Sequence, residues 1–258
     1  SGRETASYEI KISIRNPNQR VYHTESYSLE ARKTVKAKPQ FIPGATGTQM
    51  SFTVSKIPPI NLEKRLQYLI SYPYGCIEQT VSSVFPQLYL NKLTSLSGKQ
   101  QDKIENNIKN TIKRLNGFQI YPGAFTYWPD GRYPSDWGTS YAGNFLILAK
   151  EKGYYVPTNV LNSWIAYQQK AANDWKGHPD KYGRYRDDLN QAYRLYTLAL
   201  AGKPAMSAMN RMHEMAHLSN QALLRLAAAY ALINEKSTAR QIMRNVRWSA
   251  SGGQDDWR

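Results

Sequence analysis

The residues that could do chemistry lie in one short segment, which contains the single cysteine of the chain, Cys76. Pro73 and Gly75 end one predicted helix, and a new helix is predicted to begin at Cys76. Three positions separate Cys76 from Gln79, so at a helix start both side chains lie on the same face. The thiol can therefore reach the carboxamide carbon of Gln79, and attack with loss of ammonia would give an internal thioester.

Three features of this segment would help such a bond. A helix N-terminus stabilises a thiolate, Gly75 allows a tight backbone turn, and aromatic neighbours could exclude water that would hydrolyse the ester. The alternative is structural: a single cysteine is often an inert small hydrophobe, and helix capping alone would select Glu78. Residue types alone leave both interpretations open.

The chain before residue 57 shows the period of two that is typical of half-buried strands. Apolar and polar residues alternate over Tyr8–Ile14 and again over Met50–Ser55, and the segments 21–24 and 27–29 are also strand-like. Three or four strands have unpaired edges and are few for an independent sandwich. We therefore expect this part to belong to a sheet that other residues complete.

After Ile57–Ile60 the pattern becomes helical, and Gly and Pro residues mark several helix ends. An aromatic stretch over 121–137 separates two of the helices and would either fill a core or line a pocket. Paired helices suit a bundle, a solenoid or an α/α toroid. The predicted helices cover 61–71, 76–93, 99–115, 138–152, 158–171, 187–201, 205–216, 219–233 and 236–246.

Composition excludes several classes of function. One cysteine cannot form an intramolecular disulfide or a multi-thiolate metal site, and no apolar run is long enough to span a membrane. The net charge of +15 is compatible with nucleic acid, but no nucleic-acid motif accompanies it, and charge alone indicates solubility and non-specific contacts. His213 and His217 are a possible metal pair on one helix, yet no third ligand is suitably spaced. We expect no metal, no separate cofactor and no nucleic-acid partner.

Five segments carry a resemblance to a known family. Tyr-Pro-Tyr-Gly-Cys-Ile-Glu-Gln-Thr (72–80) resembles the thioester motif of the bacterial alpha-2-macroglobulin family, within the complement and alpha-2-macroglobulin superfamily. Residues 57–70 resemble the lead-in to that motif, 123–129 and 135–142 the turn and helix after it, and 191–202 a later helix. The segments occur in the family's order, and the resemblance covers nearly the whole chain.

The resemblance implies a fold and a domain organisation. In that family the thioester domain is an α/α toroid inserted into a CUB-type β-sandwich. Residues 1–57 would then be the first portion of the CUB-like sandwich, 58–248 a truncated thioester domain, and 249–258 a tail. The fold expected is mainly α, preceded by a partial β-sandwich, and the chain is expected to be a fragment of a much larger protein.

The resemblance also implies a mechanism, with Cys76 supplying the sulfur and Gln79 the acyl group. Cleavage of a bait region elsewhere in the protein exposes the thioester, and a Lys amine of the trapped protease attacks the Gln79 carbonyl. The reaction is used once, so the protein would be a protease inhibitor and not an enzyme. The expected partners are target proteases and other domains of the same protein. The expected location is the periplasm or cell envelope, with a lipid anchor on a missing N-terminal part.

Other roles are less specific. Tyr72, Tyr74, Tyr127 and Trp128 could shield the thioester from water, or they could simply pack in a core. Some complement relatives use a histidine to pass the acyl group to hydroxyls, and His178 is the candidate for its counterpart here. Its neighbours do not match the complement pattern, so we expect direct reaction with amines.

Three rival functions remain. In a cysteine hydrolase or transferase, His178 or His213 would act as base for Cys76. A toroid enzyme of the terpenoid-cyclase type would need an acidic motif, for which Asp187-Asp188 is the candidate; we interpret that pair as a helix N-terminal cap. A binding module with an inactive thioester is the third.

Overall fold

The computed structural model describes residues 10, 21, 23–38, 40–45, 47–52, 54, 69–70, 74–182, 185 and 187–247. The chain divides into two units, Ser1–Pro59 and Ile60–Arg258. The predicted domain boundaries at 57 and 248 fall on residues outside the described ranges and remain predictions.

The described residues of the first unit form extended chain with turns at 31–32 and 43–44, and none of them is in a strand. The strands predicted at 21–24, 27–29 and 50–55 are therefore wrong at the described positions. The apolar side chains of these segments are largely exposed to solvent: Tyr27 is 54% exposed, Phe52 83% and Val54 75%. A strand needs a paired neighbour and a face to bury. The strand predicted over Tyr8–Ile14 lies outside the described residues, except for the exposed Ile10.

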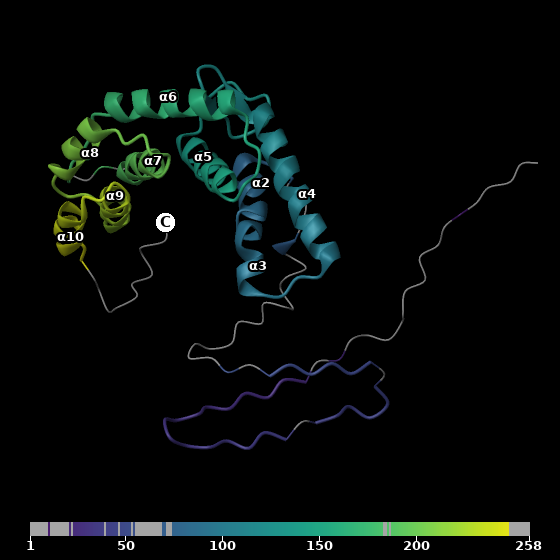
Figure 1. Cartoon of the computed structure of the whole chain (residues 1–258). Helices are drawn as coiled ribbons and strands as arrows, with labels where there is room; N and C mark the ends of the chain where they lie inside the picture. Colours follow the sequence, from purple (N-terminus) through teal and green to yellow (C-terminus); the bar gives the residue numbers. More distant parts are fainter. Residues whose placement is uncertain are drawn as a thin grey trace, which may run out of the picture. The chain divides into compact units, whose positions relative to one another are not determined.

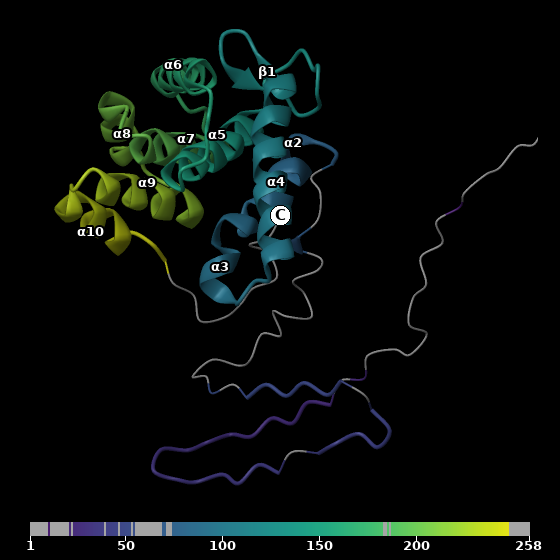
Figure 2. The ribbon, with the colours of Figure 1, turned by 45° about the vertical axis from the view of Figure 1, so that its right-hand side comes forward.

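The second unit is helical (Figures 1 and 2), which confirms the predicted mainly α class. One short antiparallel hairpin interrupts it, made by β1 (Gln119–Ile120) and β2 (Ala124–Phe125). The α-helices are α2 (Ile77–Val84), α3 (Leu90–Leu93), α4 (Gly98–Leu115), α5 (Asp136–Glu151), α6 (Thr158–Asp174), α7 (Asp188–Leu200), α8 (Met206–His213), α9 (Asn220–Leu232) and α10 (Lys236–Arg244), and the 3-10 helices are η1 (Pro86–Tyr89) and η2 (Asn116–Phe118).

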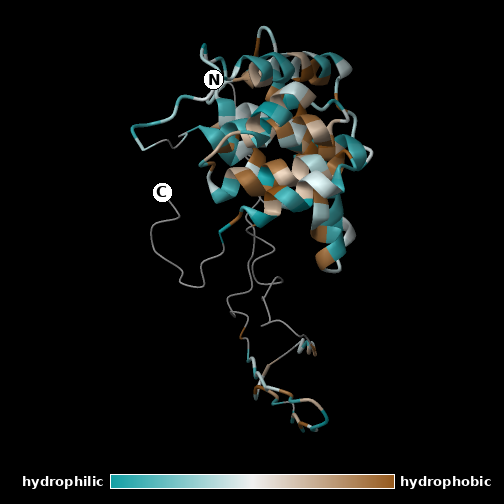
Figure 3. Cartoon of the chain, turned by 90° about the vertical axis from the view of Figure 1, so that its left-hand side faces the viewer, coloured by the Kyte–Doolittle hydropathy of each residue, from teal (hydrophilic) through white to brown (hydrophobic). Residues whose placement is uncertain are grey.

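The helices form two layers of an α/α arrangement. The inner layer is α2, α5, α7 and α9, each packed against the next, and α4, α6, α8 and α10 lie outside them (Figure 1). Hydrophobic residues are frequent along the helical ribbons of this unit (Figure 3), and the buried ones form two core clusters. Gly143 of α5 permits close approach of α6, because a Cβ there would lie 2.1 Å from the ring of Trp164. The Trp164 indole in turn donates to the carbonyl of Thr139 at 2.8 Å.

Several predicted helix bounds need correction. The helix predicted over 76–93 is broken into α2, η1 and α3, because Pro86 has no N–H to continue the α-helical ladder. The helix predicted over 205–216 ends at His213. The helix predicted over 61–71 lies outside the described residues, except for its last positions.

The acidic pair Asp187-Asp188 does not cap α7 through its side chains, which corrects the sequence interpretation. Asp187 accepts a hydrogen bond from the Trp175 indole at 2.7 Å. Asp188 is buried and accepts from both the backbone N–H and the hydroxyl of Ser219, at 2.6 and 3.0 Å. Each carboxylate thus fixes the start of α7 to a neighbouring segment, and each is committed to structure.

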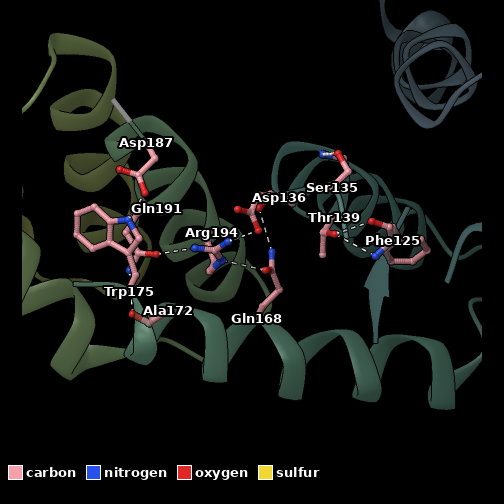
Figure 4. Close-up of polar contacts among 12 residues, drawn as sticks. Phe125, Ser135, Asp136, Thr139, Gln168, Ala172, Trp175, Asp187, Gln191 and Arg194 are labelled. Atoms are coloured by element: carbon pink, nitrogen blue, oxygen red, sulfur yellow. Dashed lines mark hydrogen bonds and ion pairs between the residues drawn. The ribbon is translucent and has the colours of Figure 1, made fainter. Parts of the chain in front are cut away.

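A buried arginine joins three helices (Figure 4). Arg194 of α7 is 4% exposed and donates from Nε to Gln168 Oε1 of α6 at 3.1 Å. Its Nη1 donates to Gln191 Oε1 at 2.7 Å, and its Nη2 to Asp136 Oδ1 at the start of α5 at 2.8 Å. Gln168 continues the network to the Ser140 hydroxyl at 3.0 Å. Inner helices α5 and α7 and outer helix α6 are thereby held in one relative position.

We predict that Arg194→Met destabilises the protein by about 2–4 kcal/mol, because it leaves buried amide oxygens of Gln168 and Gln191 without a donor. Urea unfolding followed by circular dichroism measures the loss. Arg240→Met, on the exposed side of α10, is the matched control and should change stability little. Equal effects of the two substitutions would contradict the prediction.

Candidate functional site

Cys76 stands at the N-cap of α2, with only 3% of its surface exposed. Gly75 before it has a φ of +88°, the left-handed region that glycine enters without steric cost. The first turn of α2 is then closed by the Thr80 N–H, which donates to the Cys76 carbonyl at 2.9 Å. The sequence thus places a buried thiol at the positive end of a helix.

The side chain of Gln79 folds back over this turn. Its Oε1 accepts a hydrogen bond from the Cys76 backbone N–H at 3.2 Å. A Cβ on Gly75 would lie 1.9 Å from Gln79 Oε1 and 3.0 Å from Gln79 Cδ, so a side chain at position 75 would displace the carboxamide. The predicted proximity of the Cys76 and Gln79 side chains is therefore supported by backbone geometry. The arrangement offers a nucleophile, an acyl carbon and an N–H donor at the acyl oxygen.

Tyr127 joins the site from the loop after β2. Its hydroxyl lies within hydrogen-bonding reach of the Cys76 side chain and of Glu78, and the interaction with Cys76 is the main reason why the pKa of Tyr127 is raised above its ordinary value. Its backbone carbonyl accepts from the Ile77 N–H at 3.0 Å. Tyr127 therefore contacts α2 through both its side chain and its main chain.

The loop after β2 is also bonded to η2, the 3-10 helix that follows α4. The Phe118 carbonyl accepts from the backbone N–H and the hydroxyl of Thr126, at 2.8 and 3.1 Å. Gly138 of α5 packs against Ile77, where a Cβ would lie 2.7 Å from the Ile77 Cγ2. The site is thus built where α2, α5 and the α4–hairpin segment meet.

Two further contacts were missed by sequence reasoning. The Gly75 carbonyl accepts from Arg114 Nη2 at 3.3 Å and from the Thr80 hydroxyl at 3.4 Å. Thr80 follows Cys76 by one helical turn and could have been found from that spacing. Arg114 is 39 residues away on α4, and no local pattern indicates that it reaches Gly75.

The other aromatic residues predicted at the site lie near its surface. Tyr74 is 71% exposed, Trp128 56% and Tyr127 43%, and the rings of Tyr127 and Trp128 meet edge to face at 5.6 Å. Tyr72 lies outside the described residues. Packing of these three rings in a core is therefore excluded, while shielding of a thioester stays a prediction.

The histidines lie in other parts of the unit. His178 is exposed in the connection between α6 and α7, and His213, the last residue of α8, faces the Tyr230 ring at 6.0 Å. Neither has a contact with Cys76 among the described residues. His217 lies beyond the end of α8 with a φ of +62°, so the expectation that His213 and His217 share a helix face is wrong.

The described residues contain no group of three or more His, Cys, Asp and Glu side chains placed to hold a metal ion. None of the described helices combines the length and the apolar character needed to traverse a bilayer.

Comparison with known proteins gives one consistent family. The A-macroglobulin TED domain family matches residues 45–241. Alpha-2-macroglobulin of Escherichia coli (strain K12) is 37% identical over 109 residues, which are 41% of this chain and 7% of that protein. This chain spans between 7 and 14% of the length of the relatives that it matches.

Solved structures agree with the sequence match. Salmonella alpha-2-macroglobulin reacted with methylamine superposes with a TM-score of 0.63 at 27% identity, over 78% of this chain and 14% of that one. Trypsin-activated alpha-2-macroglobulin from Escherichia coli superposes with a TM-score of 0.57 at 26% identity, over 68% of this chain and 13% of that one.

We predict that Gly75→Ala displaces the Gln79 carboxamide, because the new methyl group would occupy the position of Oε1. The Cys76 amide would lose its acceptor, and its hydrogen exchange, followed by NMR, should accelerate. Gly153→Ala is the matched control: Gly153 has a similar φ of +90° but open space around its Cα. Both variants should lose about 1–2 kcal/mol from backbone strain. Unchanged exchange at Cys76 in Gly75→Ala would contradict the prediction.

The Tyr127 phenol should also report on Cys76. Its raised pKa keeps the hydroxyl protonated further into the alkaline range, so its hydrogen bonds are lost only as the pH rises through that higher pKa. The reference is Gln79→Ala, which cannot form a thioester and keeps the Cys76 thiol free; adding Cys76→Ala to it removes the main cause, and the Tyr127 pKa should fall towards the ordinary value for tyrosine. NMR titration of ring-labelled tyrosine measures it, with the exposed Tyr133 as internal control. An unshifted Tyr127 pKa in this variant would rule out the contact with Cys76.

Proposed function

Because the chain belongs to the A-macroglobulin TED domain family, we propose that it is the thioester-bearing part of an alpha-2-macroglobulin-like protease inhibitor. The observation that carries the proposal is the fold of the Gln79 carboxamide over the Gly75–Cys76 turn, with Gln79 Oε1 on the Cys76 N–H. The same kind of bond closes a capping box, as Gln100 does at Ser97; what distinguishes the turn at Gln79 is the buried thiol of Cys76 at its N-cap.

The bond forms within the chain. The Cys76 sulfur attacks Cδ of Gln79, the Gln79 oxygen takes negative charge, and the carbon–nitrogen bond then breaks. The thiol proton leaves with the nitrogen as ammonia, and the product is a thioester between Cys76 and Gln79. No external reactant is required.

The thioester then reacts with an amine. The amine nitrogen attacks the Gln79 carbonyl carbon, the carbon–sulfur bond breaks, and the proton released by the amine passes to the departing sulfur. A lysine of a protease is linked in this way to Gln79 through an amide, and Cys76 becomes a free thiol. One chain reacts once, so the proposed role is inhibition without turnover.

The relatives support this assignment. The Salmonella protein was solved after reaction with methylamine, a small primary amine, and the Escherichia coli protein after activation by trypsin or by porcine elastase. We extend these properties to the present chain: its partners would be proteases and other parts of the same inhibitor, and its place of action the periplasm or cell envelope.

The rival functions receive less support. A cysteine hydrolase needs a base at Cys76, yet in the part of the chain that the structure describes the neighbours of its side chain include Tyr127 and no histidine. A cyclase-type toroid needs free acidic groups, whereas Asp187 and Asp188 are engaged by Trp175 and Ser219.

We predict that the freshly prepared chain is lighter than its sequence mass by one ammonia and has no titratable thiol. Methylamine should add to Gln79 and release one thiol per chain, as measured by intact mass and thiol titration. Gln79→Glu should show its full sequence mass and a free thiol, because a carboxylate has no ammonia to lose. Gln221→Glu, on the exposed side of α9, is the control and should behave as wild type.

A wild-type chain with its full sequence mass and a freely titratable Cys76 would contradict the proposal. So would methylamine incorporation that persists in Cys76→Ala, since amine transfer to Gln79 would then not pass through the thioester.

A further inference from the structure

We propose that Arg114 is a positioning residue of the thioester site, which acts through the peptide bond between Gly75 and Cys76. This inference rests on the proposed function. It assigns to α4 a part in the chemistry that takes place at the start of α2.

The geometry centres on a single peptide group. Its carbonyl oxygen, on Gly75, accepts from Arg114 Nη2 at 3.3 Å. Its N–H, on Cys76, donates to Gln79 Oε1 at 3.2 Å. The guanidinium and the carboxamide therefore lie at opposite ends of one peptide dipole, so a change at one end is felt at the other.

The structure holds the Arg114 guanidinium firmly at this peptide. Arg114 lies in the last turn of α4, and its Cζ is 5.7 Å from the centroid of the Phe118 ring. Its Nε is buried and has no hydrogen-bond partner among the described residues. The Nη2 hydrogen bond and the contact with Phe118 therefore determine where the guanidinium lies.

The chemical consequence follows from where charge develops. When sulfur or an amine attacks Cδ of Gln79, negative charge forms on Oε1, the atom that the Cys76 N–H already contacts. A cation at the carbonyl end polarises the peptide and makes its N–H a stronger donor. Arg114 thus stabilises the oxyanion both when the thioester forms and when an amine opens it.

The neutral Thr80 hydroxyl shares the Gly75 carbonyl at 3.4 Å. It can help to orient the peptide, but it brings no charge. The two donors therefore separate orientation from polarisation: Thr80→Val removes a hydrogen bond alone, while Arg114→Met removes the hydrogen bond and the positive charge.

The test compares four variants of the full 258-residue chain: Arg114→Met, Arg114→Lys, Thr80→Val and Arg211→Met. Arg211 is the matched control, because its Nη2 also donates to backbone carbonyls, those of Ala172, Asn173 and Trp175, and its Nε is also buried without a partner among the described residues. Circular dichroism and Tm establish that each variant is folded. The measurement is the rate of thiol release by methylamine, divided by the thioester content at the start.

Arg114→Met should lower this normalised rate about tenfold, less than the loss of a donor in direct contact with an oxyanion, because the charge acts through a peptide. Arg114→Lys should recover part of the rate, since an ammonium keeps the charge. Thr80→Val should lower the rate less than Arg114→Met, and Arg211→Met should lower Tm without changing the rate. A rate in Arg114→Met that is unchanged, or that rises as in a loosened site, would overturn the inference.

The outcomes separate this inference from the proposed function. Wild-type chain without loss of ammonia refutes the proposed function, and the inference falls with it. Wild-type chain with an intact thioester, together with a normal rate in Arg114→Met, refutes the inference alone. The Cys76 amide proton provides a second readout: its NMR shift should move upfield in Arg114→Met, as its hydrogen bond weakens, and stay in place in Arg211→Met.

Discussion

The proposed thioester site depends on one hydrogen bond, from the Cys76 backbone N–H to Gln79 Oε1. This contact brings an otherwise exposed side chain back over the buried Cys76 at the start of α2. It requires Gly75 in the left-handed region, since any Cβ there would overlap the carboxamide. A capping glutamine is common at the third position of a helix; here the N-cap residue that it contacts is the buried Cys76.

The remainder of the second unit keeps this turn in place. Outer helix α4 supplies Arg114 to the Gly75 carbonyl, and the hairpin that follows it supplies the Tyr127 carbonyl to the Ile77 N–H. Inner helix α5 packs its Gly138 against Ile77. The Arg194 network then fixes α5 to α6 and α7. The two-layer α/α arrangement therefore matters to the site because three separate elements must meet at the first turn of α2.

The sequence predicted what depends on short spacing. The helical class and the helix ends at Gly153 and Gly202 follow from patterns within a few residues, and the structure agrees. The spacing of Cys76 and Gln79 is equally local, and the bond between their side chains stays a prediction. It did not predict Arg114 at Gly75 or Arg194 at Asp136, because these contacts join residues far apart in the chain. The strands expected before residue 57 failed at the described positions for a related reason: alternation shows which residues could share a face, but a strand also requires a neighbour to pair with. The sequence predicts a local helix cap at Asp187 and Asp188, but the hydrogen-bond partners of these side chains lie 12 and 31 residues away.

The two residues that the proposed thioester would join, Cys76 and Gln79, differ in their exposure to solvent. This difference indicates from which side an amine would attack. Cys76 is buried, while Gln79 lies at the surface. An attacking amine would therefore approach the carbonyl carbon from the solvent side, and the sulfur would depart towards the protein. In the proposed reaction the leaving sulfur would lie next to the Tyr127 hydroxyl, whose hydrogen bond with the Cys76 side chain is the main cause of its raised pKa. The Cys76 N–H would continue to donate to Gln79 Oε1 during the reaction, and Arg114 would continue to donate to the Gly75 carbonyl of the same peptide. In the proposed reaction the amine, the oxyanion and the leaving sulfur would thus occupy three separate positions at the start of α2. The amine could then open the thioester without a rearrangement of α2.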